Sequence, residues 1–109
     1  MPSSDLVFGA LADPTRRAVL MLVGRQGPVT ATELAEHLPV SRQAVVKHLD
    51  ALHTAGLVDR DKLGRDVRYG LRPAALDEAG AWMDHVGAAW DRRLAVLARR
   101  ATTRRRVER

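Results

Sequence analysis

The sequence contains no cysteine at all. This absence excludes disulfide bonds, zinc sites built on thiolates, iron–sulfur clusters and cysteine nucleophiles. No apolar run approaches the ~18 residues that a membrane span requires, and the first residues form no basic and then apolar leader. We therefore expect a cytoplasmic protein that does not interact with a membrane.

Signatures of catalysis are missing too. The chain has no glycine-rich phosphate loop, no nucleophile elbow and no paired carboxylates beside a histidine. We expect no enzyme, no catalytic residue and no cofactor. What is present is typical of one folded domain, because 46% of the 109 residues are hydrophobic and 28% are charged.

The positive charge is concentrated at the C-terminal end. Residues 99–109 contain six arginines and one glutamate, whereas the preceding residues carry twelve cations and twelve anions. Clustered arginines favour an anionic polymer as partner, although a solvated end without structure has the same composition. We expect one domain over residues 1–98 and a disordered, Arg-rich tail over residues 99–109.

Capping residues divide the first half of the chain into short helices. Apolar residues at helical spacing predict a first helix near residues 6–11, and Asp13 and Pro14 are suited to begin a second helix that Gly27 ends. Thr30 and Glu33 have the spacing of a capping box for a third helix at about residues 31–37.

The second half begins with a fourth helix and ends with a long one. Ser41 is placed to cap a helix from residue 42 to Gly56, where glycine can adopt a left-handed conformation. Residues 57–61 and 67–71 flank a polar turn and predict a β-hairpin. Pro73 begins a helix that runs to about Ala98.

This order of elements predicts a winged helix-turn-helix: a mainly α (α+β) fold with a two-stranded β-hairpin wing and a long C-terminal dimerisation helix. On the fourth helix, Val45, His48, Leu49, Leu52 and Ala55 form one stripe that is expected to be buried. The residues left on the other side can read base edges, thymine methyl groups and phosphates. A solvated helix face and an exposed, soluble loop are the alternatives. The predicted DNA-binding residues are Thr30, Thr32, Ser41, Arg42, Gln43, Val46, Lys47, Lys62, Arg65 and Arg68.

Four linked segments of the chain resemble the ArsR/SmtB family of bacterial transcriptional regulators. They are ALADPTRR from Ala10, ELA from Glu33, SRQAVVKHL from Ser41 and AGLV from Ala55. The resemblance covers roughly residues 5 to 98, and one departure is Val46, where many relatives carry serine. It implies a dimeric DNA-binding repressor whose operator affinity is changed by a small effector.

The long last helix carries an apolar repeat of seven residues that includes Met83, Trp90 and Leu97. Such spacing forms a continuous seam, and glycines along it let a second helix approach closely. A seam used within one chain is the alternative to a homodimer. The predicted dimer interface comprises Leu6, Val7, Leu76, Trp82, Met83, Val86, Trp90, Leu94 and Leu97.

Metal sensing is not expected. The last helix offers Asp84, His85 and Asp91 without a second histidine, and a metal needs at least three convergent ligands. An organic small-molecule effector, a protein partner or autoregulation remains, and an effector site is expected near Trp82, Met83 and Trp90.

The sequence thus predicts a homodimeric repressor, associated with the nucleoid, on a two-fold related operator of double-stranded DNA. A metal-sensing repressor and a non-specific nucleoid or protein-interaction module are the alternatives.

Overall fold

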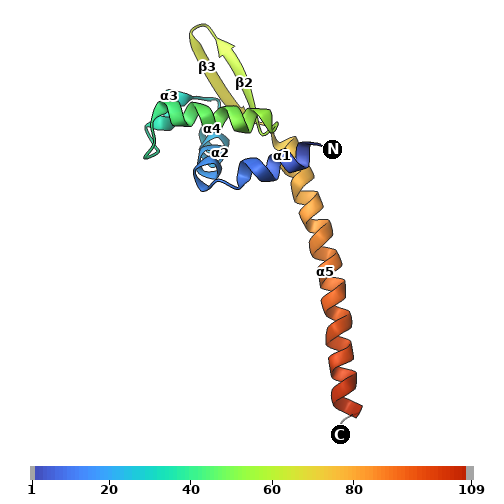
Figure 1. Ribbon diagram of the computed structural model, residues 1–109. Helices are drawn as coiled ribbons and strands as arrows, with labels where there is room; N and C mark the ends of the chain where they lie inside the picture. The colour runs from blue at the N-terminus through green and yellow to red at the C-terminus, as the bar shows by residue number, and fades with distance from the viewer. Residues whose placement is uncertain (1, 108–109) are drawn as a thin grey trace. The chain divides into compact units, whose positions relative to one another are not determined.

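The computed structural model describes residues 2–107, with side chains for residues 5–101 (Figure 1). It consists of two compact units, Met1–Ala79 and Gly80–Arg109. The first unit holds every element apart from the larger part of the last helix. The predicted domain over residues 1–98 remains a prediction.

Four helices of the first unit confirm the predicted order. They are α1 (Pro2–Leu11), α2 (Pro14–Gln26), α3 (Ala31–Ala35) and α4 (Arg42–Thr54). Helix α3 ends at Ala35, before the predicted His37. Helices α3 and α4 with the turn between them form the helix-turn-helix.

Side-chain oxygens fix where these helices begin. The Thr30 hydroxyl accepts from the Glu33 amide at 3.1 Å, and the Glu33 carboxylate accepts in return from the Thr30 amide at 3.5 Å, so the capping box is present. Ser41 Oγ accepts from the Ala44 amide at 3.1 Å and caps α4. These local bonds set the register of both helices relative to the turn.

A three-stranded antiparallel sheet of order β1-β3-β2 completes the first unit. The hairpin of β2 (Val58–Leu63) and β3 (Asp66–Leu71) is longer than predicted, because its turn is only Gly64 and Arg65. Gly64 has a φ of 64°, which suits the tight hairpin turns that place glycine first. The hairpin projects away from α2, α3 and α4 as the wing (Figure 1).

The third strand is missing from the sequence prediction. Strand β1 (Val29–Thr30) pairs with β3, with Val29 opposite Tyr69 and Thr30 opposite Arg68. Two residues are too few to show the alternation by which a strand is recognised. The strand ties the start of α3 to the base of the wing.

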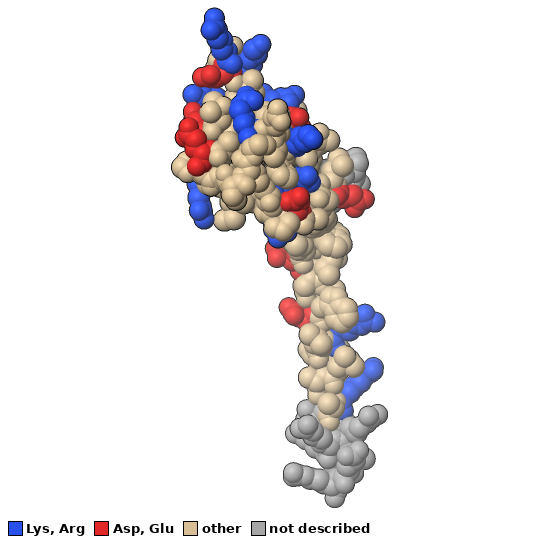
Figure 2. Space-filling view, turned by 60° about the vertical axis from the view of Figure 1, so that its left-hand side comes forward, with Lys and Arg blue, Asp and Glu red and all other residues tan. Residues whose placement is uncertain are grey.

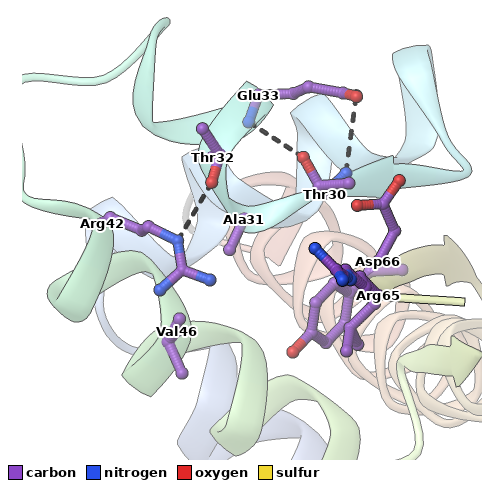
Figure 3. A pocket seen from close by; sticks show the side chains of 10 residues that line it. Thr30, Ala31, Thr32, Glu33, Arg42, Val46, Arg65 and Asp66 are labelled. Atoms are coloured by element: carbon purple, nitrogen blue, oxygen red, sulfur yellow. Dashed lines mark hydrogen bonds between the residues drawn. The ribbon is translucent and has the colours of Figure 1, made fainter. Parts of the chain in front are cut away.

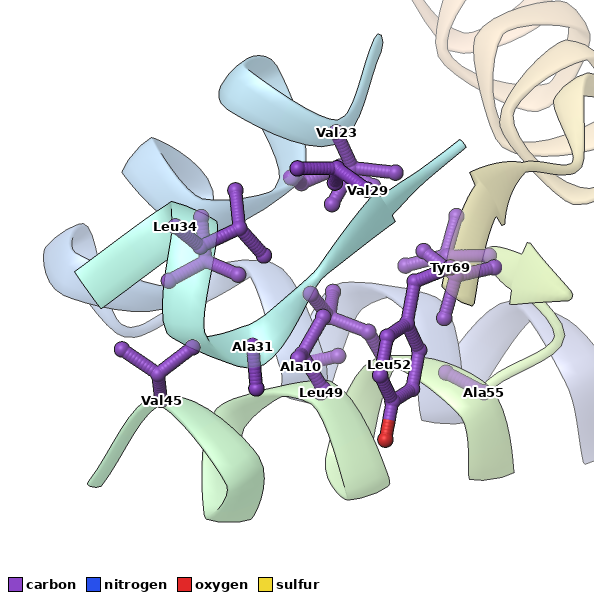
Figure 4. Packing of buried hydrophobic residues seen from close by; sticks show 14 of the residues in the cluster. Ala10, Val23, Val29, Ala31, Leu34, Val45, Leu49, Leu52, Ala55 and Tyr69 are labelled. Atoms are coloured by element: carbon purple, nitrogen blue, oxygen red, sulfur yellow. The ribbon is translucent and has the colours of Figure 1, made fainter. Parts of the chain in front are cut away.

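The core lies where α4 packs against α2, α3 and the sheet (Figure 4). Val45, Leu49 and Leu52 are fully buried and Ala55 is 5% exposed, so the predicted buried stripe is confirmed apart from His48, which is half-buried. His48 lies at the edge of this stripe, where its Nδ1 accepts from Arg16 Nε at 3.3 Å. The stripe therefore determines which side of α4 faces outward.

The last helix, α5 (Pro73–Val107), continues past Ala98, so the predicted end is too early. Residues 99–107 are helical and form no separate tail without structure, and arginines are good helix formers, which explains the continuation. Within the first unit, Ala79 is 2% exposed and Leu76 packs against the core. Among the described residues, no helix is long and apolar enough to cross a membrane.

Asp13 caps α2, and this cap predicts a pH dependence of stability. Its Oδ1 accepts from the amides of Thr15 at 2.8 Å and Arg16 at 3.1 Å. The bond from the Arg16 amide, with that from Thr15, lowers the pKa of the Asp13 carboxyl below its ordinary value.

A lowered pKa means that the ionised form of Asp13 stabilises the folded state, and that this stabilisation is lost as the carboxyl is protonated. We expect the free energy of unfolding of the parent to exceed that of Asp13→Asn at neutral pH, and the difference to shrink as the pH falls below about 4. Urea unfolding of both proteins, from neutral pH to below about pH 4, measures the difference in the free energy of unfolding. A constant difference would contradict the assignment.

Candidate nucleic-acid interface

The outward face of α4 presents polar side chains at its N-terminal end. Arg42, Gln43 and Lys47 are exposed, as expected for residues that reach into a DNA groove. Val46 is only half-buried and packs against the core, so less of it faces outward than the prediction of a thymine contact assumed. Its neighbours therefore carry most of the readable surface.

Arg42 is held in place by the helix that precedes it in the motif. Its Nε donates to Thr32 Oγ1 at 3.0 Å, which turns the guanidinium toward α3 (Figure 3). The other nitrogens of the guanidinium remain available as donors. Thr32 thus positions a predicted DNA-binding residue across the helix-turn-helix.

The hydroxyls of Thr30 and Ser41 accept the capping bonds of α3 and α4. A hydroxyl that accepts a bond keeps its own proton as a donor. Each can therefore cap a helix and still donate to a phosphate oxygen.

The tip of the wing carries Lys62 and Arg65, both exposed. No carboxylate of the described residues forms an ion pair with either of them or with Lys47. Figure 2 shows basic side chains projecting where the wing ends, at the top of the view. These cations have the accessibility that a phosphate contact requires.

Arg68, another of the predicted DNA-binding residues, lies beside carboxylates of the protein itself. Its guanidinium lies 3.6 Å from Glu33 Oε1 and 3.6 Å from Asp66 Oδ2, and its side chain is 33% exposed. It also donates to the carbonyl of Pro28 at 3.5 Å. Arg68 therefore has carboxylate partners within the protein, unlike the residues at the wing tip.

A cleft of about 540 Å³ separates the wing from the helix-turn-helix. Thr30, Thr32, Arg42, Val46 and Arg65 of the predicted set line it (Figure 3), whereas Gln43, Lys47, Lys62, Ser41 and Arg68 do not. Its other lining residues were not predicted: Ala31, Glu33, Asp66, Val67 and Tyr69. The pairing of β1 with β3 brings these together, and no short-range pattern signals it.

The predicted dimer residues fall into exposed and buried groups. Trp82, Met83, Trp90, Leu94 and Leu97 of α5 are each between 53% and 55% exposed, and Leu6 of α1 is 47% exposed. Val86 is half-buried. Val7 is 1% exposed within the core of the first unit, so it has almost no surface left for a partner.

The histidine and carboxylate side chains that the structure describes do not converge on one site. The described residues contain no group of three or more His, Cys, Asp or Glu side chains placed to hold a metal ion. Asp84, His85 and Asp91 are all exposed on α5.

Comparisons with known proteins identify the family. Residues 11–61 match a family described as a helix-turn-helix domain. The chain is 35% identical over 77 residues to the transcriptional repressor SdpR of Bacillus subtilis, a match that covers 71% of this chain and 84% of SdpR. It is also similar to the solved structure of an ArsR-like transcriptional regulator from Rhodococcus sp. RHA1, with 45% identity, a TM-score of 0.76 and coverage of 88% and 90% of the two chains.

The chain belongs to the ArsR family of transcriptional regulators. The cadmium metal-sensor CMTR from Mycobacterium tuberculosis is a further similar structure, with 40% identity, a TM-score of 0.53 and coverage of 62% of this chain and 68% of that one. The predictions of a winged helix-turn-helix fold, of a DNA-binding repressor and of a protein that is not an enzyme are confirmed.

For this ArsR-family protein, the exposed face of α4 predicts which residue reads sequence. Gln43→Ala removes a side chain that can bond bidentately to adenine, so we expect a loss of ~1–3 kcal/mol on the preferred site and a relaxed base preference. Lys47→Ala serves as the comparison, because loss of a phosphate contact weakens binding to all duplexes alike.

Fluorescence anisotropy with the DNA upstream of the protein's own gene, and with its single-base variants, separates the two effects. If Gln43→Ala leaves both affinity and base preference unchanged, the orientation of α4 in the groove is wrong.

Proposed function

We propose that this ArsR-family repressor acts as a homodimer on a two-fold related operator, with α4 of each subunit in the major groove and the wing against the flanking backbone. The observation that carries the proposal is the apolar stripe of α5, defined as Trp82, Met83, Trp90, Leu94 and Leu97. Each of these large side chains is more than half exposed. So much apolar surface on one helix is typical of an interface.

The spacing of the stripe supports another helix as its partner. Met83, Trp90 and Leu97 recur every seven residues, so they follow one line along the helix. Gly80 and Gly87 stand three residues before Met83 and Trp90, where they leave room for close approach of a neighbouring backbone. A helix of this kind is most stable when its apolar line is covered.

The charges of α5 support a second copy of the same chain. Acidic Asp84 and Asp91 lie nearer its N-terminal end, whereas the described arginines lie farther along: Arg92, Arg93, Arg99 and Arg100. Two antiparallel copies bring the acidic part of each close to the basic part of the other. In an isologous dimer, two-fold symmetry makes the acidic part of each α5 face the basic part of the other.

A dimer sets the spacing of its DNA contacts. Two recognition helices on one face of the duplex require half-sites about one helical turn, ~10 bp, or a multiple apart. A non-specific nucleoid module with the same basic surface would bind a random duplex as well as the upstream region.

Trp90→Ala tests the dimer. Removal of this indole from a buried seam should cost ~3–5 kcal/mol, shift sedimentation to monomer and weaken protection of paired half-sites in footprinting. Met21→Ala is the matched control, because Met21 is 56% exposed on α2, outside the stripe, and the change should leave the dimer intact. A Trp90→Ala protein that stays dimeric and equally stable, or parent protein that protects one isolated half-site as a monomer, would refute the proposal.

We further propose that an organic small molecule, rather than a metal, releases the dimer from DNA. The chain lacks thiolate ligands, and the histidine on the described part of α5 is His85. The apolar stripe near Trp82, Met83 and Trp90 offers aromatic surface for such an effector. A coupling free energy of ~1–3 kcal/mol between effector and operator suffices for regulation.

Operator titrations with zinc, nickel and chelator test this part. We expect the same operator affinity under all three conditions, because the chain has no thiolate and the described residues of one subunit contain no group of three or more potential metal ligands. Tryptophan fluorescence should instead respond to the effector. A zinc-dependent loss of operator binding that His85→Ala abolishes would show that the protein senses metal.

A further inference from the structure

The cleft between the wing and the helix-turn-helix contains charges of both signs. Arg42 lines it from α4 and Arg65 from the wing tip, while Glu33 and Asp66 line it as well. Two carboxylates in a small cleft repel phosphate as strongly as two guanidinium groups attract it. With these four side chains alone, the cleft would have no net charge and little affinity for DNA.

Arg68 changes this balance without lining the cleft. It projects from β3 between the two carboxylates, 3.6 Å from Glu33 Oε1 and 3.6 Å from Asp66 Oδ2. Both acidic side chains of the cleft thus share one arginine. With Arg68 included, the local charge becomes positive by one unit.

The same arginine has little freedom to reach outward. Its guanidinium also donates to the Pro28 carbonyl at 3.5 Å, and its backbone pairs with Thr30 of β1. A phosphate contact by Arg68 would require its guanidinium to leave the Pro28 carbonyl and would leave Glu33 and Asp66 without a counter-ion. Arg42 and Arg65 need no such exchange, because neither forms an ion pair with a described carboxylate.

We propose that Arg68 is an internal counter-ion that neutralises Glu33 and Asp66, and that the cleft thereby binds one backbone phosphate of DNA between Arg42 and Arg65. The Thr32 hydroxyl holds Arg42 by its Nε, so the remaining nitrogens of the guanidinium can donate to the phosphate. Arg68 is accordingly a positioning residue. In this proposal Arg68, which the sequence predicts as a DNA-binding residue, supports DNA binding through Glu33 and Asp66 and not by a contact of its own.

The inference rests on the proposed placement of DNA along α4 and the wing. It concerns phosphate contacts, which do not depend on base sequence, so a random-sequence duplex is a sufficient probe. Operator preference and dimerisation, which test the proposed function, are measured separately on the upstream DNA and by sedimentation. A failure of this inference can therefore be distinguished from a failure of the proposed function.

The experiment measures the affinity of the full-length protein for that duplex as a function of salt. Arg68→Gln should weaken binding about tenfold and lower the salt slope by about one per subunit, because the cleft loses its net positive charge and its phosphate. Arg65→Ala should give the same change of slope. Arg25→Gln, which removes an exposed arginine at the end of α2, is the control and should stay within about twofold of the parent.

The deciding variant removes the two acids together with the arginine. In Glu33→Gln/Asp66→Asn/Arg68→Gln, the cleft carries the two charges of Arg42 and Arg65, one unit more than in the unchanged protein, so affinity and salt slope should recover at least to the values of the unchanged protein. The Glu33→Gln change preserves the capping box, because the side-chain oxygen of a glutamine can also accept from the Thr30 amide. Thermal unfolding monitored by circular dichroism verifies that the variants fold.

Two outcomes would overturn the proposal. If the triple variant binds as weakly as Arg68→Gln, Arg68 itself contacts the phosphate. If Arg68→Gln binds like the parent, the ion pairs of Arg68 have no role in DNA binding.

Discussion

The burial of one stripe of α4 is the constraint on which the predicted DNA-binding surface depends. Val45, Leu49 and Leu52 are fully buried among α2, α3 and the sheet, and they leave only one side of the helix to face outward. Rotation of α4 about its axis would expose these side chains at a cost of several kcal/mol. The packing that stabilises the fold therefore also sets which residues of α4 face outward, and among these Arg42 is held further by its bond to Thr32.

Local hydrogen bonds explain how much of the fold could be predicted from the sequence. Asp13, Thr30 and Ser41 mark helix starts within three residues of the amides that they accept from, so the helices of the first unit can be recognised from the sequence. The alternation of Val67, Tyr69 and Leu71 likewise indicates β3. Membership of the ArsR family follows from segments that carry these same local features.

The cleft could not be predicted in this way, because long-range pairing creates it. Arg68 is separated by more than thirty residues from Glu33, and only the antiparallel pairing of β1 with β3 brings Thr30 opposite Arg68. From the sequence alone, a basic residue in the wing is predicted to contact DNA, because the sequence does not show which carboxylates lie beside it. Val7 is a second example of what the sequence does not show. Helical spacing predicts that Val7 is covered, but it does not show that the core of its own domain covers it and not a second subunit.

The wing also constrains how this protein can diverge. Its ladder is unbroken from Val58 opposite Leu71 to Leu63 opposite Asp66, and the two-residue turn leaves no slack. Because side chains alternate between the faces of a strand, one extra residue in each strand would carry Arg65 to the opposite side of the hairpin. The length of the wing can therefore change without moving Arg65 to the other side only in steps of two residues per strand, so insertions of other sizes at this position should be rare among functional descendants.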